Sequence, residues 1–305
     1  MKKWLLILTL LISRLYGYGS LSHDSTDYFY TSDSTKLYVE KSGTGPVCIF
    51  IHGGPGAWSR SFSDLGGKQL EDSLTMVYYD QRGSGRSASP LNGDYSLERM
   101  LLDIDEIRRH FGVTQVYLLA HSFGGILATN YAANYADHVK GLVMACATLD
   151  MRSSLMNQIG YVNKRLGRDF KPLDSSFGAV KTAFLSARKA LADSGLQYTM
   201  LSDDKKAVDL VDAIDKQSPS DYGFARQVFD MPVYWQNYRP LSKKVGVATL
   251  VITGAKDHAI GAQHYWGFEY PRKHVVRLPA GHLSYYENNT AFIKAVFGFV
   301  RLVER

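Results

Sequence analysis

Cysteine is scarce in this chain, since Cys48 and Cys146 are the only two among 305 residues. Both lie inside apolar, strand-like runs, PVCIFI and GLVMACATL, a setting that favours small buried side chains over a disulfide. With 45% hydrophobic residues, a chain of this length buries enough apolar surface to fold without a cross-link. The sequence therefore indicates a globular protein that does not depend on disulfides.

A strong charge bias, internal repeats and low-complexity tracts are also missing. The formal net charge is +6, and the basic residues are scattered along the chain. Three of them, Lys2, Lys3 and Arg14, fall in a segment that we expect to be removed. Nucleic-acid binding needs a clustered basic surface, so we expect no nucleic-acid partner.

The apolar run near the N-terminus is too short to cross a membrane. It covers residues 4–12, follows two lysines and precedes small residues at Gly17, Gly19 and Ser20. A transmembrane helix needs about 20 apolar residues, whereas this arrangement is typical of a secretory signal peptide. We expect residues 1–19 to be a signal peptide, cleaved after Gly17 or Gly19. The mature protein would then be periplasmic or secreted, without stable membrane insertion; an uncleaved anchor is the alternative.

Strand-like and helix-like segments alternate through the first half of the chain, as in a parallel sheet covered by helices. The alternation stops between residues 150 and 240, a segment rich in helix formers that contains the amphipathic runs KTAFLSARKALADSG and DDKKAVDLVDAIDKQ. It resumes with ATLVITGAKD and HVVRLPAGH. We therefore predict an α/β fold with a mostly parallel central sheet flanked by helices. Residues 20–149 and 241–305 form the core, and residues 150–240 form a helical cap inserted between late strands.

One serine has the sequence context of a nucleophile. In LLAHSFGGILA, Ser122 lies between an apolar strand and a helix, with Ala120 two residues before it and Gly124 two residues after it. A nucleophile elbow needs small residues at both places, because its strained turn packs tightly against the neighbouring strand and helix. Taken alone, the pattern fits a simple strand-to-helix turn equally well.

A serine nucleophile needs a histidine to accept its proton and an acid to orient that histidine. In this architecture the acid and then the histidine follow the serine, each after a late strand. Asp257 follows the run LVITGAK, and His282 follows VVRLPAG. The other histidines fit this order less well: His138, His258, His264 and His274. A metal site of Asp257, His258 and His264 is a weaker alternative, because no further strong ligand lies nearby in the sequence.

The glycine-rich run HGGPG, residues 52–56, follows the strand PVCIFI. Acyl transfer builds negative charge on a carbonyl oxygen, and two backbone N–H groups aimed at that oxygen lower the barrier. One donor is the residue after the nucleophile, Phe123, and the other comes from the loop after the third strand. Gly54 is the first choice for this second donor and Gly53 the alternative.

A second glycine-rich loop, DQRGSGRS, covers residues 80–87. It lacks the GK[ST] that a phosphate-binding loop requires. We interpret Asp80, Arg82 and Arg86 as residues that fix this loop rather than as catalytic groups. No cofactor is expected.

Taken together, HGGPG, DQRGSGRS, the elbow AHSFGG, LVITGAKD and the closing AGH resemble the proline iminopeptidase branch of the α/β-hydrolases. The resemblance covers about residues 30–149 and 241–305. It implies a serine aminopeptidase that removes an N-terminal residue, usually proline, from short peptides beneath a helical cap. Carried over, it gives Ser122, Asp257 and His282 as the triad and Gly54 with Phe123 as the oxyanion hole.

The predicted cap departs from this family in one respect. Family members typically bind the substrate's amino group with cap glutamates, whereas residues 150–240 contain no Glu. A buried ammonium needs a paired carboxylate, and we expect Asp221 or Asp230 to supply it. Aromatic residues nearby either line the substrate pocket or, more often in proteins, pack the cap on the core: Phe224, Phe229, Tyr234, Trp235 and Tyr238.

The same machinery also suits other functions. An esterase, a lactonase or a carbon–carbon bond hydrolase would use it on an uncharged acyl group, and a non-catalytic ligand-binding homologue would share the fold. In each case we expect a small-molecule or short-peptide partner.

Overall fold

The computed structural model describes residues 25–219 and 221–305. The predicted signal peptide, residues 1–19, lies outside the described residues. Within the described part, no helix is long and apolar enough to cross a membrane. Cys48 and Cys146 are both buried free thiols, as expected.

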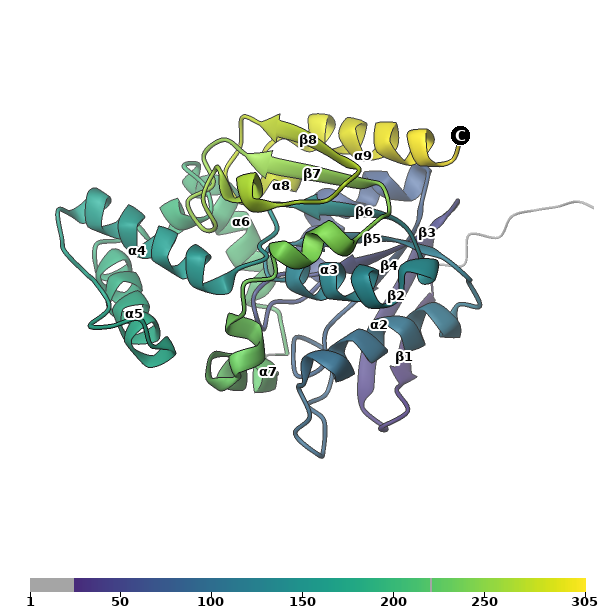
Figure 1. Cartoon of the computed structure of the whole chain (residues 1–305), viewed down its shortest axis with the longest axis horizontal. Coiled ribbons are helices and arrows are strands. Elements are labelled where there is room, and N and C mark those ends of the chain that lie inside the picture. The colour runs from purple at the N-terminus through teal and green to yellow at the C-terminus, as the bar shows by residue number, and fades with distance from the viewer. Residues whose placement is uncertain (1–24, 220) are drawn as a thin grey trace, which may run out of the picture.

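An eight-stranded sheet forms the centre of the molecule (Figure 1), in the order β1-β2-β4-β3-β5-β6-β7-β8. Its strands are β1 Ser25–Tyr30, β2 Lys36–Gly43, β3 Val47–Ile51, β4 Thr75–Tyr79, β5 Val116–His121, β6 Val139–Ala145, β7 Thr249–Gly254 and β8 Lys273–Leu278. The first two strands are antiparallel to their neighbours, and from β4 to β8 every pairing is parallel. The mostly parallel sheet is thus confirmed, with β1 as an edge strand that the sequence did not lead us to expect.

Both faces of this sheet are covered. Alternate residues of β3 point to opposite sides: Ile49 and Ile51 join the apolar cluster that includes α2 Leu97–His110 and α3 Gly124–Asn134. Cys48 and Phe50 join the cluster that includes α9 Asn289–Val303. Strands buried on both sides read as continuous apolar runs, which is why β3 to β7 stand out in the sequence.

The chain between β6 and β7 is helical. It contains α4 Met151–Leu166, α5 Phe177–Asp193, α6 Lys205–Asp215 and α7 Gly223–Gln227. Asp150, Ser176 and Asp204 cap the first three of these helices by accepting a hydrogen bond from a backbone N–H in the first turn. In Figure 1, α4 and α5 lie beyond the carboxyl ends of β7 and β8. This helical segment therefore stands over the edge of the sheet where the functional loops meet.

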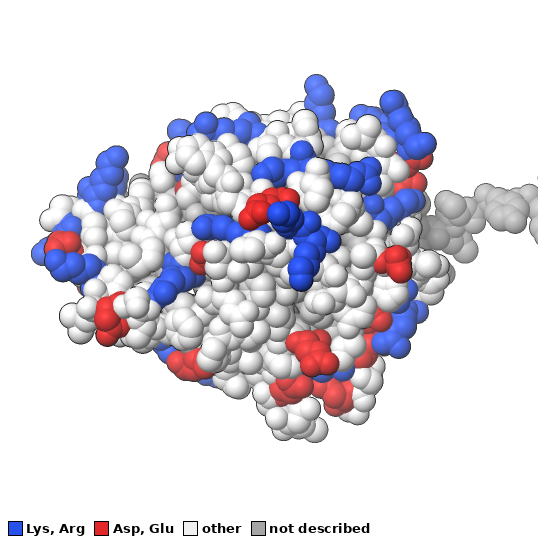
Figure 2. Space-filling model, in the orientation of Figure 1, with Lys and Arg blue, Asp and Glu red and all other residues white. Residues whose placement is uncertain are grey.

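Shorter elements complete the chain. They are α1 Arg60–Phe62, the π-helical turn η1 Ser63–Gly67, α8 Ser284–Glu287 and the 3-10 turns η2 Lys68–Asp72, η3 Ala136–His138, η4 Gln197–Met200, η5 Val228–Asp230, η6 Pro232–Trp235, η7 Pro240–Lys244 and η8 His264–Gly267. On the face in Figure 2, basic and acidic side chains are both present and neither sign covers the surface.

Buried ion pairs fix the loop DQRGSGRS, as its composition suggested. The Asp80 carboxylate is fully buried and accepts hydrogen bonds from the Ser59 N–H at 2.8 Å and from the Arg86 Nε at 2.8 Å. Burial would raise the pKa of Asp80, but the hydrogen bonds and charge of Arg86 outweigh it and hold the pKa below its ordinary value. Arg82, also fully buried, pairs with Asp103 at 2.7 Å and with Asp33 at 2.8 Å.

We expect Asp80→Asn to destabilise the fold by about 3 kcal/mol at pH 7, because it leaves Arg86 buried beside a neutral amide. A lowered folded pKa means that Asp80 stabilises the protein fully above the unfolded value of about 3.9 and that this contribution is lost as the pH falls through the folded pKa. Urea unfolding of both proteins from pH 7 down to 3.5 should therefore show a difference that shrinks only below about pH 4.

Asp64→Asn is the control for this measurement. Asp64 pairs with Arg60 at 3.2 Å on the surface, so its loss should change stability by less than about 1 kcal/mol. Equal effects of the two substitutions would contradict the structural role given to Asp80.

Candidate active site

Ser122 lies at a sharp turn between β5 and α3. Its φ of +52° is unusual for a residue with a side chain, and its N–H donates to the Cys146 carbonyl at 3.1 Å. A Cβ added at Gly124 would collide with the Ile51 carbonyl oxygen, so this position requires glycine. The local geometry is that of a nucleophile elbow, in which the small neighbours expected from sequence allow β5, α3 and β3 to approach closely.

Asp257 and His282 come together from the loops after β7 and β8. His282 Nδ1 lies 2.9 Å from Asp257 Oδ2, and Asp257 Oδ1 accepts the N–H groups of Ala259 and Ile260. Burial would raise the pKa of Asp257, but the charge and hydrogen bond of His282 lower it to about 2. An ionised Asp257 keeps the proton of His282 on Nδ1, which leaves Nε2 free to accept another.

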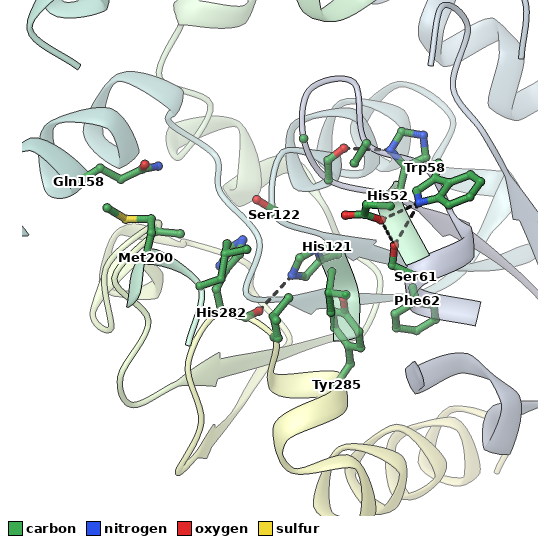
Figure 3. A pocket seen from close by; sticks show the side chains of 18 of the residues that line it. His52, Trp58, Ser61, Phe62, His121, Ser122, Gln158, Met200, His282 and Tyr285 are labelled. Atoms are coloured by element: carbon green, nitrogen blue, oxygen red, sulfur yellow. Dashed lines mark hydrogen bonds between the residues drawn. The ribbon is translucent and has the colours of Figure 1, made fainter. Parts of the chain in front are cut away.

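Ser122 and His282 line one cavity, with a volume of about 290 Å³. Figure 3 shows both residues at this cavity, with Gln158 and Met200 on one side of them and Trp58 and Ser61 on the other. No hydrogen bond joins the Ser122 hydroxyl to His282, although both residues are described. Catalytic hydrogen bonds are often long before substrate binds, so the arrangement supports the predicted triad.

The loop after β3 also reaches this cavity. Gly53 and Gly54 line it, and Gly54 has a φ of +114° that suits glycine. A Cβ added at Gly53 would lie 2.7 Å from the Ser122 Cβ, so Gly53 is what permits the loop to touch the serine. In the described parts of the chain, neither the Gly54 N–H nor the Phe123 N–H has a recorded acceptor. Both donors therefore remain available for an oxyanion.

Two histidines that the sequence analysis did not weigh support this site. His52 Nε2 accepts the N–H of Gln81 at 2.9 Å, and its Nδ1 lies 2.9 Å from the Gly53 carbonyl. Burial lowers the pKa of His52, which favours the neutral ring that these two bonds require. His121 lines the cavity beside Ser122, and burial together with the His282 charge lowers its pKa to about 3. His52 is the first residue of HGGPG and His121 directly precedes Ser122, and these positions were the available sequence signal.

Three predicted substrate-binding residues are not at the cavity. Asp221 accepts the Ser89 N–H at 2.9 Å and hydroxyl at 2.8 Å, and so ties the helical segment to the core. Asp230 pairs with Lys181 on the surface, and Trp235 is buried with its indole N–H bonded to the Phe229 carbonyl. These three side chains have structural partners and do not line the cavity, so the predicted role in substrate binding is not supported for them.

The helical segment supplies a different acid. Asp215, the last residue of α6, lines the cavity, and its Oδ1 accepts the Trp58 indole N–H at 2.7 Å and the Ser61 hydroxyl. Trp58 belongs to the loop after β3 and Ser61 to α1, which follows that loop, so Asp215 joins the helical segment to the core. Nothing in the sequence distinguishes Asp215 from the other aspartates of α6, Asp209 and Asp212.

The metal alternative is not supported by the geometry. Among the described residues, one cluster of three ligand-type side chains is compact enough for a metal: Cys146, Asp257 and His282. Two members of this cluster, Asp257 and His282, are already hydrogen-bonded to each other, and His258 and His264 do not belong to it. His258 instead stacks on Tyr161 and lies 3.4 Å from Asp203, and burial lowers the pKa of His264 to about 4.

Comparisons with known proteins show the family of this chain. A family model described as the alpha/beta hydrolase fold matches residues 46–289. The proline iminopeptidase of Saccharolobus solfataricus is 31% identical over 150 residues, which cover 48% of this chain and 44% of that protein. The proline iminopeptidase of Clostridium botulinum is 34% identical over 112 residues, covering 36% of this chain and 38% of that protein. The chain thus spans less than half the length of the curated relatives that it matches.

Among solved structures, the proline iminopeptidase-related protein of Thermus thermophilus has a TM-score of 0.71 at 20% identity, covering 91% of this chain and 99% of that chain. At this identity the likeness shows the fold alone. The family match, in contrast, extends over more than half of the sequence. The chain therefore belongs to the α/β-hydrolase fold family, in which it is similar to the proline iminopeptidases.

Proposed function

We propose that this protein is a serine hydrolase of the aminopeptidase type, which releases the N-terminal residue of short peptides through an acyl-Ser122 intermediate. One observation carries the proposal: Ser122 at a left-handed elbow shares a cavity with the His282–Asp257 pair and the glycine loop. The similarity to proline iminopeptidases supports the substrate class.

In the proposed reaction, the Ser122 hydroxyl attacks the first peptide carbonyl while His282 Nε2 accepts its proton. The N–H groups of Gly54 and Phe123 bind the developing oxyanion, each lowering the barrier by about 3 kcal/mol. His282 returns the proton to the departing amine, so the peptide bond breaks and an ester to Ser122 remains. Water, deprotonated by His282, then hydrolyses that ester and releases the amino acid.

Asp215 is the acid that we assign to the substrate's free ammonium group. Its Oδ1 is held by Trp58 and Ser61, while no protein donor to Oδ2 is recorded among the described residues. A carboxylate fixed on one oxygen and open on the other suits a charge-assisted hydrogen bond. It would take the place of the glutamates that the cap lacks.

The reactivity of Ser122 can be tested without a substrate. A fluorophosphonate should form one adduct, on Ser122, and Ser122→Ala should remove it. Gly53→Ala should slow this labelling about 100-fold, because the new methyl group displaces the serine from its reactive position. Gly160→Ala is the matched control, since a Cβ there meets no atom within 4 Å. Labelling of the Ser122→Ala protein would refute the assignment.

The substrate class can be tested with prolyl and alanyl anilides, their N-blocked counterparts and simple esters. We expect the free-amine anilides to be preferred and Asp215→Asn to lower their kcat/KM by about 10- to 100-fold, as for loss of a charged hydrogen bond. Asp209→Asn is the control, because Asp209 pairs with Lys205 on the exposed side of the same helix. A preference for blocked anilides or esters would instead favour an esterase.

A further inference from the structure

Arg188 is an arginine of the active-site cavity without a protein partner. It lies on α5, and its Nη1 is buried with no hydrogen bond to any described residue. Burial lowers the pKa of Arg188, and no neighbouring acid opposes this effect. A guanidinium in this position has lost water without gaining a carboxylate.

Several other buried or partly buried arginines in this structure have an acidic partner. Arg82, Arg86, Arg99 and Arg108 each form an ion pair with an aspartate or glutamate at 2.7–2.9 Å. Leaving a buried charge unpaired is costly. Arg152 and Arg239 also have a buried nitrogen without a hydrogen bond, but neither lines the cavity. Arg188 does line it, so a ligand in the cavity can supply the missing anion.

The position of Arg188 in the cavity suggests which part of a substrate it meets. Arg188 lies on α5, which packs against α4 and η4. Gln158 of α4 and Met200 of η4 line the cavity together with Arg188, so these three elements form one wall of it. In Figure 3, Met200 and Gln158 lie on one side of Ser122, and Trp58 and Ser61, the partners of Asp215, lie on the other. No ion pair joins Arg188 to Asp215, although both are described: Asp215 bonds to Trp58 and Ser61, and Arg188 Nη1 has no partner.

We infer that Arg188 binds the C-terminal carboxylate of the substrate, and that the cavity is built for dipeptides with both ends free. A dipeptide carries an ammonium group at one end and a carboxylate at the other, with the cleaved bond between them. Asp215 and Arg188 match this order on either side of Ser122. The inference deepens the proposed function and rests on it for the direction in which the substrate lies.

The chemistry and size of the cavity agree with this substrate. A guanidinium donates two parallel hydrogen bonds to the two oxygens of a carboxylate. A C-terminal amide has one acceptor oxygen and no charge, so its hydrogen bond to the guanidinium is weaker. The volume of about 290 Å³ is at the lower limit of small-ligand sites, about 300–1,000 Å³, which favours a short substrate.

The test compares Pro-Ala and Ala-Ala with the same dipeptides amidated at the C-terminus. The wild-type enzyme should prefer the free acids by about 10- to 100-fold in kcat/KM. Arg188→Gln should reduce this acid-to-amide ratio to near one, and Arg188→Lys should keep part of it. Lys189→Gln is the matched control: it removes the same charge from the next residue, which pairs with Asp193 on the surface, and should keep the wild-type ratio.

Binding separates this inference from the proposed function. Calorimetry on Ser122→Ala should show tighter binding of Ala-Ala than of its amide, and the double variant with Arg188→Gln should lose that difference. Turnover of aminoacyl anilides with equal turnover of acids and amides would overturn the carboxylate site and leave the aminopeptidase intact. Preferential binding of the acid without turnover of any peptide would overturn the aminopeptidase and leave the carboxylate site. If Arg188→Gln fails to fold, the wild-type ratio and Arg188→Lys decide the question.

Discussion

The close approach of three backbone segments at the carboxyl edge of the sheet governs this site. The turn after β5 holds Ser122 at positive φ, α3 starts against the end of β3, and the loop after β3 lies against the serine. Gly124 and Gly53 make these contacts possible, since a Cβ at either position would collide with its neighbour. Glycine weakens the local backbone, so the buried pairs of Asp80 and Arg82 are needed to hold the adjacent loop in place.

The core and the helical segment contribute different residues to the site at this edge. In the proposed reaction, the core supplies the groups that move protons and bind the oxyanion. They stand on loops that follow strands, where rigid elements position them. The helical segment supplies Asp215 and Arg188, from α6 and α5. A change in the helices can therefore alter which substrate is bound without disturbing the Asp257–His282 pair.

Local patterns in the sequence were sufficient to predict the sheet, and they also led to the proposed triad. Parallel strands buried on both faces show as apolar runs, and a serine with small neighbours, followed by an acid and a histidine after late strands, has few alternatives in one chain. The sequence was not sufficient for the cavity side of the helices. Asp221 seemed suitable because aromatic residues lie near it in sequence, yet its partner Ser89 lies 132 positions away in the chain. Helical periodicity shows which face of a helix is apolar. It does not show which polar residue at the border of that face points into a cavity formed with another part of the fold.

The two charged residues of the cavity differ in what holds them, and this difference bears on specificity. Asp215 is an exposed residue whose Oδ1 accepts hydrogen bonds from Trp58 and Ser61 of the core, so it is held in place before any substrate arrives. Arg188 lines the cavity, and its buried Nη1 has no hydrogen-bond partner. A neutral ligand end would leave that charge buried and unpaired, whereas an anionic end would relieve it. A site with a buried polar group rejects a ligand that cannot pair with that group more strongly than it attracts a ligand that can. Discrimination between substrates would then come mainly from the free-energy penalty on substrates that lack the carboxylate.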